Sequence, residues 1–378
     1  MTDRPPGARR RASLAVAAAS LVAALGLVAC GGEGGESPEA EGPTPTSAAQ
    51  VPYDRAFAFK QPIPEGAALD ARSAAIARQV DENHRLGKVF LDSRGVPPVY
   101  VAHGSDPTYE VLVGGEAVRF RVPPEAQEGG GADHPLVILD PNHPDFGRHT
   151  ELRLFGADVD HAGRTLSARG AGLLHYNNDG RALNPDGSPS VSVPFAGQGT
   201  GSGLSVLAGL IRPAEVRAGR IRHALRFSYS NRDFSDRFRA PAVKTDQPKD
   251  TTTRNPATAM DMGMRLQLDP AVNCDRRTVP GKADRSRETR FLRMVCRALQ
   301  EYGMIVADGT GDRGLILMME HTRTAGWEAI VGQERFGNYS YLVRNDESSE
   351  DGLGRGPTAG IPWDRFRVLK RSAFPADR

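Results

Sequence analysis

Cysteine, aromatic residues and an excess of one charge sign are all scarce in this chain. Its 378 residues include three cysteines and 6% aromatics, against 42 glycines and 28 prolines. This composition favours short strands joined by turns over a helical bundle. Charge is balanced, with 48 Lys and Arg against 46 Asp and Glu. Since a duplex-binding surface needs a clustered positive face, we do not expect a nucleic-acid partner.

Common catalytic and metal-binding motifs are absent as well. The sequence has no Gly-x-Ser-x-Gly elbow and no His-Glu-x-x-His, which argues against the commonest serine hydrolases and zinc proteases. The Gly-rich run 197–205 lacks the Lys of a phosphate-binding loop. Neither Cys274 nor Cys296 stands at a metal-ligand spacing. We therefore expect neither a metal nor a cofactor.

The N-terminus has the features of an export signal. Three arginines, Arg9–Arg11, precede the uncharged apolar run Leu14–Ala29, which is shorter than the roughly 20 residues that span a bilayer. The run ends in Leu27-Val28-Ala29-Cys30, which resembles the lipobox of bacterial lipoproteins. The resemblance implies cleavage before Cys30 and lipidation of its thiol and new amino group. The alternative is a plain secretory peptide with an incidental cysteine.

These features divide the chain into three parts. Residues 1–29 are the predicted signal peptide. Residues 30–50 are rich in Gly, Pro, Glu, Ser and Thr, cannot bury enough surface to offset chain entropy, and are predicted to form a disordered tether. Residues 51–378 are predicted to form a single folded domain. We expect an exported lipoprotein of the cell membrane or outer membrane, facing away from the cytoplasm and held by the lipid on Cys30.

With Cys30 lipidated, two cysteines remain in an oxidising compartment. A disulfide between Cys274 and Cys296 is the economical prediction. Two reduced, separated thiols are the alternative.

The pattern of apolar residues predicts a mainly β fold with helices at 67–86 and 288–302. Strands are expected at 99–103, 109–113, 117–122, 136–139, 150–155, 173–176, 190–195, 221–229, 264–268, 304–307, 314–319 and 361–369. Strands and helices do not alternate regularly, which disfavours a doubly wound parallel sheet. We predict an antiparallel, jelly-roll-like β-sandwich with one or two helices and long loop insertions.

Three blocks of sequence resemble a set of exported bacterial proteins whose function has not been characterised. The blocks are GSGLSVLAGLIRPAEVRAGRIRHALRF, MRLQLDP and RALQEYGMIVADGTG. The resemblance spans about residues 136–368. It implies export and supports these domain boundaries, but implies no reaction.

His223, Asp140 and Glu151 are the candidate site residues. His223 falls on the inward face of the predicted strand 221–229 and titrates near neutral pH, although a lone inward histidine is more often a hydrogen-bonded core residue. Asp140 and Glu151 are expected near adjacent strands, and two carboxylates are the minimum for glycoside hydrolysis. Asp-Pro after a strand is also ordinary turn chemistry. Asp308 begins a run that partly imitates a calcium loop, but a hairpin turn explains it better.

Two functions from different classes follow from these features. The first is a non-catalytic envelope lipoprotein that binds glycan or protein. The alternative is a carbohydrate-active enzyme, a glycoside hydrolase or polysaccharide lyase, using acidic residues and His223.

Overall fold

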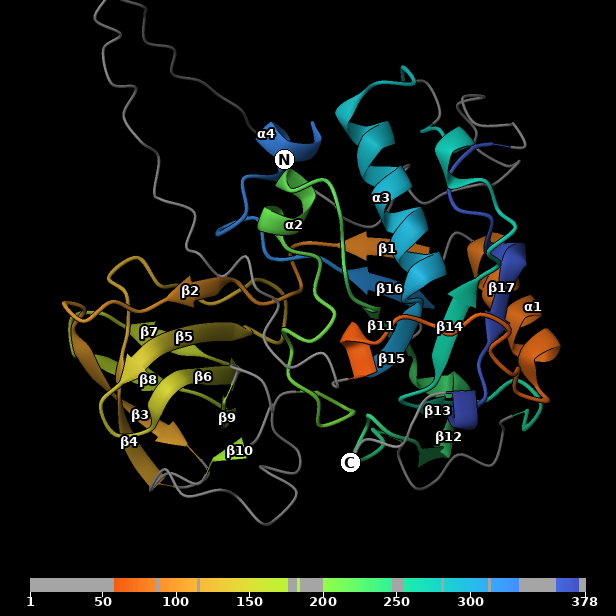
Figure 1. Cartoon of the computed structure of the whole chain (residues 1–378). Helices are drawn as coiled ribbons and strands as arrows, with labels where there is room; N and C mark the ends of the chain where they lie inside the picture. Colours follow the sequence, from red (N-terminus) through yellow and green to blue (C-terminus); the bar gives the residue numbers. More distant parts are fainter. Residues whose placement is uncertain are drawn as a thin grey trace, which may run out of the picture. The chain divides into compact units, whose positions relative to one another are not determined.

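Four β-sheets organise the described part of the chain in the computed structural model (Figure 1). The structure describes residues 58–85, 89–113, 116–175, 182–183, 200–246, 255–279, 282–311, 314–332 and 358–373. These residues form seventeen strands and four α-helices, which confirms the prediction of a mainly β fold. The predicted signal peptide, the tether with Cys30, and the strand expected at 190–195 lie outside the described residues.

The largest sheet has six strands and mixes parallel with antiparallel pairs. In order across the sheet they are β1 (Val89–Asp92), β16 (Leu315–Met318), β11 (Leu225–Ser230), β15 (Met304–Thr310), β14 (Arg265–Leu268) and β17 (Phe366–Val368). β1 is parallel to β16 and β11 is parallel to β15, while the other neighbours are antiparallel. The predicted antiparallel arrangement is therefore wrong for this sheet. Parallel pairs need long crossover connections, and β11 and β15 lie far enough apart in the chain to have one.

Two helices pack on this sheet. Apolar side chains of α1 (Ser73–Arg85) and α3 (Arg287–Glu301) share one buried cluster with side chains of β11, β14 and β15. Figure 1 shows α3 lying across the sheet. The Ser286 hydroxyl caps the start of α3 by accepting a hydrogen bond from the Thr289 N–H (3.0 Å), and Gly303 follows its end with a φ of 72°. The later of the two predicted helices is confirmed.

The first helix begins later than predicted. A helix was expected over 67–86, whereas α1 starts at Ser73. Upstream of it, the Asp70 carboxylate accepts a hydrogen bond from the Arg72 N–H (2.9 Å), and Leu69 bridges to Leu369. A local side-chain to backbone bond of this kind competes with helical hydrogen bonding, so the helix forms only after it.

Two further sheets are built mainly from residues 99–175. One has the order β10 (Ala182–Leu183), β9 (Gly170–His175), β6 (Gly147–Phe155), β5 (Leu136–His143) and β2 (Val99–Val101), and the other has the order β4 (Glu116–Arg121), β3 (Thr108–Val113), β8 (Thr165–Ser167) and β7 (Asp158–Asp160). Residues of both sheets share one apolar cluster, which includes Val111, Phe120, Ile138 and Leu152. Most pairs here are antiparallel, as predicted, although β2–β5 and β3–β8 are parallel.

The predicted end of the strand at 136–139 is wrong. β5 does not stop at Leu139, because its pairing with β6 continues on either side of Pro141 as far as His143.

The strands expected at 304–307 and 314–319 do not form the predicted hairpin. β11 lies between β15 and β16, so Asp308 is not in a hairpin turn but within β15. All six residues of β11 are buried, as expected of a central strand with both faces covered.

The segment 200–212 links the apolar clusters of the sheets. Leu204 and Ala208 share a cluster with Ile305 of β15, while Leu207 and Leu210 share another with β2 and β5. The short helix α2 (Pro213–Arg217) follows this segment. Elsewhere β12 (Phe234–Phe238) pairs with β13 (Met260–Met262), and α4 (Trp327–Val331) completes the helices of the described residues.

The predicted disulfide is present. Cys274 and Cys296 are joined, with their Cα atoms 5.7 Å apart. The bond ties a short 3-10 turn at Cys274–Arg276 to the buried face of α3.

Candidate functional site

Asp140 lies in β5 as one half of a buried ion pair. Its carboxylate is 1% exposed and accepts two hydrogen bonds from the Arg121 guanidinium, at 2.6 and 2.7 Å. It also accepts one from the Asn142 N–H (3.0 Å). Bidentate pairing of this kind joins β4 to β5 and occupies both carboxylate oxygens.

Glu151 lies in β6 and is fully buried. Both of its carboxylate oxygens accept from the Ser205 hydroxyl, at 2.8 and 3.0 Å. In register, Glu151 stands opposite Leu139 while Asp140 stands opposite Thr150. Because successive residues of a strand point to opposite faces, Asp140 and Glu151 project from opposite sides of the sheet.

His223 lies just before β11 and is also fully buried. Its Nδ1 is 2.8 Å from the Ala224 carbonyl oxygen, and its Nε2 is 3.0 Å from Oε2 of Glu215 in α2. Burial opposes a charge on the imidazole, but the Glu215 carboxylate and the hydrogen bonds outweigh it and raise the pKa of His223. The three predicted residues therefore have three separate sets of partners.

A different group of polar residues gathers where β11 and β15 end. We call it the carboxylate site and define it as Ser228, Asn231, Lys244, Asp246 and Asp308. Because β11 and β15 are parallel, their carboxyl ends meet at the same edge of the sheet. The backbone of Ser202 ties this edge to the chain near Lys244, since Ser202 N–H donates to Ala307 O (3.2 Å) and Val243 N–H donates to Ser202 O (3.0 Å).

A β-bulge turns Asp308 into this site. Phe227 pairs with Val306 but the next residue, Ser228, pairs with Asp308, so Ala307 is the extra residue. Without the bulge, strict alternation would place Asp308 on the same face as Val306, which belongs to the apolar cluster under α3. The bulge instead places Asp308 on the side of Ser228 and Arg226. Bulges are over-represented beside functional sites, where they re-aim a side chain.

The Asp308 carboxylate is held by backbone groups and one buried cation. Oδ1 accepts from the N–H groups of Gly201 (2.8 Å) and Gly309 (3.0 Å). Oδ2 is 3.9 Å from the guanidinium of Arg226, which is fully buried, while the Asp308 side chain is 25% exposed. Asp308 is thus fixed in position and still reached by solvent.

Asp246 and Asn231 reach the same two glycines from other segments. A Cβ atom on Gly201 would lie 2.9 Å from Asp246 Oδ2, and one on Gly309 would lie 2.7 Å from the same oxygen. That second Cβ would also lie 1.9 Å from Asn231 Oδ1. The absence of side chains at these glycines is what lets the carboxylate and the amide approach. Asp246 itself is exposed.

Two acceptor atoms of the carboxylate site are buried without a partner. Within the part of the chain that the structure describes, neither Ser228 Oγ nor Asn231 Oδ1 has a hydrogen-bond partner. Ser228 is only 2% exposed. Buried polar atoms in native proteins are nearly always hydrogen-bonded, so unpaired ones at an accessible edge indicate a place for ligand or water.

Three ionisable groups of the carboxylate site have shifted pKa values. Burial raises the pKa of Asp308 to about 6, against the opposing charge of Arg226, and Asp246 adds to the rise. Desolvation by surrounding protein also raises the pKa of Asp246, while the charge of Lys244 lowers it. Desolvation lowers the pKa of Lys244. Carboxyl groups with raised pKa values at an accessible site are typical of proton-transfer and polar-ligand sites.

Sequence reasoning missed this site for physical reasons. The local pattern predicts a turn at Asp308, because neither the bulge nor the insertion of β11 can be read from it. Asp246 lies in a polar, Pro-rich segment that has no periodicity. The available signal was the Asp-Gly pair at the end of an apolar strand, where carboxyl-end loops commonly carry function.

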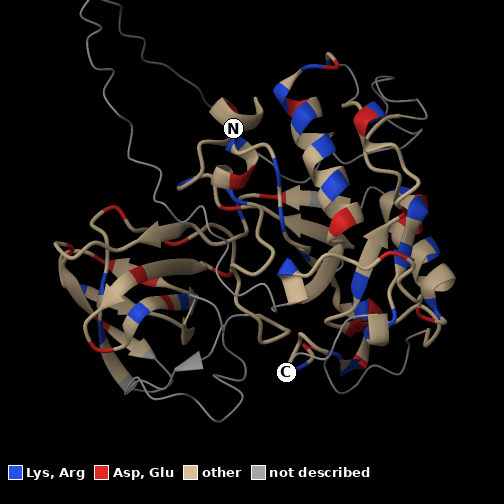
Figure 2. Ribbon diagram, in the orientation of Figure 1, with Lys and Arg blue, Asp and Glu red and all other residues tan. Residues whose placement is uncertain are grey.

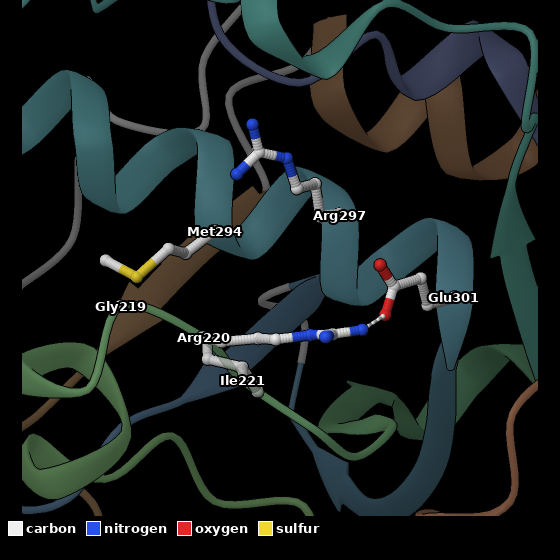
Figure 3. Close-up of a pocket in the computed structure, with 6 residues that line it drawn as sticks. All are labelled: Gly219, Arg220, Ile221, Met294, Arg297 and Glu301. Atoms are coloured by element: carbon white, nitrogen blue, oxygen red, sulfur yellow. Dashed lines mark hydrogen bonds and ion pairs between the residues drawn. The ribbon is translucent and has the colours of Figure 1, made fainter.

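Two surface pockets lie outside the carboxylate site, and in the part of the chain that the structure describes neither gathers buried, unpaired polar groups as that site does. The first, of about 270 Å³, is lined by Gly219, Arg220, Ile221, Met294, Arg297 and Glu301 (Figure 3). Its charges are already paired, since Arg220 binds Glu301 at 2.8 Å and Arg297 binds Asp275. The second, of about 550 Å³, lies along α1 and β17 and includes Leu69 and Phe366.

Lys and Arg are interspersed with Asp and Glu along the ribbon (Figure 2). Arginines follow one another along α3, but Arg287 donates to the Glu328 and Ala329 carbonyls and Arg293 pairs with Asp284. Among the described residues, no three His, Cys, Asp or Glu side chains are grouped to hold a metal ion. The helices described here are all too short or too polar to cross a membrane.

Comparison of the chain with known protein families, curated proteins and solved structures finds no match.

Proposed function

We propose that this chain is an exported, lipid-anchored envelope protein whose folded part binds a glycan of the cell envelope at the carboxylate site. Residues 1–29 would direct export, Cys30 would carry the lipid, and residues 30–50 would hold the folded part away from the membrane. The lipobox resemblance and the composition of the tether support this arrangement.

The unpaired polar atoms of the carboxylate site favour a glycan as its ligand. Among the described residues, neither the Ser228 hydroxyl, which can donate or accept, nor Asn231 Oδ1, which accepts, has a hydrogen-bond partner, and both lie beside the carboxylates of Asp246 and Asp308. Sugar hydroxyls donate and accept at the same time, so neighbouring hydroxyls could satisfy the amide, the hydroxyl and the carboxylates together. Lys244 adds a donor at the same edge.

The finer fold is part of the proposal. We infer that residues 99–175 form a two-layer sandwich, because the five-stranded and four-stranded sheets share one apolar cluster. A jelly-roll-like connection is supported only by the predominance of antiparallel pairs in these two sheets.

A carbohydrate-active enzyme, hydrolase or lyase, is the second candidate. The predicted site residues give this candidate little support, because each has its own buried partner and they do not form one catalytic set. They are Asp140, Glu151 and His223. The observation that favours it is the pair of desolvated carboxylates in the carboxylate site, Asp246 and Asp308.

The test is glycan binding by the full-length chain purified in detergent. Immobilised peptidoglycan and bacterial polysaccharides are offered to the wild type and to the variants Ser228→Ala and Asn231→Ala. Each variant loses one hydrogen bond worth about 1 kcal/mol, so Kd should rise by roughly 5- to 10-fold.

Ser73→Ala is the matched control. Ser73 is also a buried serine, but its hydroxyl accepts from the Val368 N–H (2.8 Å) beside α1. It should lower stability and leave glycan affinity unchanged. Retention of no glycan by the wild type, or retention that the Ser228 and Asn231 variants do not weaken, contradicts the proposal.

A further inference from the structure

We propose that Asp308 and Asp246 act as an acid–base pair that hydrolyses a glycosidic bond of the glycan held at the carboxylate site. The inference rests on the glycan binding proposed above and adds a reaction and two catalytic residues to it. Asp308 is the general acid and Asp246 is the general base.

The geometry brings the two carboxyl groups to one place from different segments. Both lie at Gly201 and Gly309: Asp308 accepts hydrogen bonds from their N–H groups, and Asp246 Oδ2 would be within 3 Å of a Cβ atom on either glycine. Asp308 projects from a strand and is held on one oxygen by two backbone donors. Asp246 belongs to a segment tied to the same edge through the Val243–Ser202 hydrogen bond. Asp308 is thus positioned by a strand, the kind of element that holds a catalytic group precisely.

A second observation points to a ligand rather than to a mere acidic cluster. Ser228 is 98% buried, pairs with Asp308 in register, and therefore projects from the same face of the sheet. Its Oγ has no hydrogen-bond partner among the described residues. A sugar hydroxyl beside the reacting bond would supply the missing partner.

The two environments suit opposite roles. Asp308 is the more enclosed group, and burial raises its pKa to about 6, so that much of it carries a proton in weakly acidic conditions. Desolvation raises the pKa of Asp246 as well, but its side chain is exposed to water and the charge of Lys244 acts against the rise. Pairs of carboxyl groups in glycosidases divide the work in this way, the protonated one giving and the ionised one taking a proton.

The reaction consumes one water molecule. Asp308 gives its proton to the glycosidic oxygen as the bond from that oxygen to the anomeric carbon breaks. Water forms the new bond to the anomeric carbon, and the proton it loses passes to the Asp246 carboxylate. The products are two free sugar ends, and exchange with solvent returns one proton to Asp308 and removes one from Asp246.

The groups around the pair set the pH dependence. Arg226 of β11 and the Gly201 and Gly309 N–H groups favour ionised Asp308, while burial and Asp246 favour its protonated form. Lys244 interacts electrostatically with both carboxylates. Desolvation lowers its pKa, the two carboxylates act to raise it, and Arg153 of β6 acts to lower it. The rate should therefore fall as pH rises above about 6.

The experiment measures reducing sugar released by the full-length chain in detergent from the glycan it retains. Asp308→Asn should still retain the glycan, because its amide can hydrogen-bond a sugar hydroxyl, and should lower the release rate by roughly 10²- to 10⁴-fold, the usual contribution of a general acid. Because an aryl glycoside with a good leaving group does not need that proton, it should lose much less. Asp246→Asn should lower the rate on both substrates. Asp158→Asn, an exposed aspartate in β7, is the control and should behave as wild type.

The outcomes separate the two proposals. A glycan that is retained but never cleaved overturns the acid–base pair and leaves glycan binding standing. Cleavage that Asp308→Asn reduces equally on both substrates overturns the role of Asp308 as acid. An unsaturated product made without water overturns hydrolysis. If the chain retains no glycan, glycan binding itself fails.

Discussion

His223 and Asp308 represent two ways in which the described residues hold an ionisable group away from water. His223 is fully enclosed and meets a carboxylate and a carbonyl. Asp308 is partly open, and its pKa is raised because nearby protein removes water without fully compensating its charge. The first arrangement stabilises a charge inside the fold. The second leaves a proton available at an accessible edge.

The His223–Glu215 contact should make stability depend on pH. The folded-state pKa of His223 is raised, so its stabilisation is full below the unfolded value of about 6.5 and is lost as pH rises through the folded value. Thermal unfolding between pH 6 and 9 should show a falling midpoint. In Glu215→Gln the fall should be smaller, because the partner that raises the pKa is gone.

Glu301→Gln is the matched control for this prediction. Glu301 is also half of an ion pair, with Arg220, but that pair is exposed and should contribute little. This variant should keep the wild-type pH profile. An equal decline in wild type and Glu215→Gln would show that His223 is not the group responsible.

At the scale of elements, the disulfide should contribute measurably to stability. It closes a loop across 22 residues, from the Cys274 turn to α3, for which chain entropy predicts about 3 kcal/mol. Urea unfolding of Cys274→Ser/Cys296→Ser should give a free energy of unfolding lower by about that amount. Wild type in reductant should match the double variant, and the double variant should not respond to reductant. Equal stability of the oxidised wild type and the double variant would contradict the prediction.

The elements that could be predicted are those whose local pattern decides their structure. α3 has a serine cap, an apolar stripe and a glycine after its end, and each of these signals is local. The strands of the β5–β6–β9 meander also pair with near neighbours in the chain. The disulfide was predicted on the expectation that Cys30 carries a lipid, which leaves two cysteines to join.

The elements that could not be predicted depend on distant partners. β11 is inserted between β15 and β16, so its neighbours come from residues about 80 positions away. The bulge at Ala307 lies in the pairing of β15 with β11, a partner that is distant in the chain. The carboxylate site depends on both of these features. Hence the sequence indicated acidic residues as candidates but selected Asp140 and Glu151, which pair elsewhere.

At the scale of the whole molecule, Cys30 is the predicted point of attachment. Cys30→Ser should move the chain from the membrane fraction to the soluble fraction, measured by fractionation and by loss of incorporated labelled fatty acid. Ser13→Ala, which leaves the lipobox resemblance intact, should remain in the membrane fraction. A Cys30→Ser chain that still sediments with membranes would refute the lipid anchor.

The order of strands in the six-stranded sheet has a consequence for synthesis. β1 pairs with β16, and α1 packs against β17, so the earliest described elements meet the latest ones. While the chain is being made, this sheet lacks its partners until residues near 368 have emerged. Contacts of such wide sequence separation form slowly. The six-stranded sheet is therefore completed only near the end of synthesis, whereas the sheets of residues 99–175 have their partners much earlier.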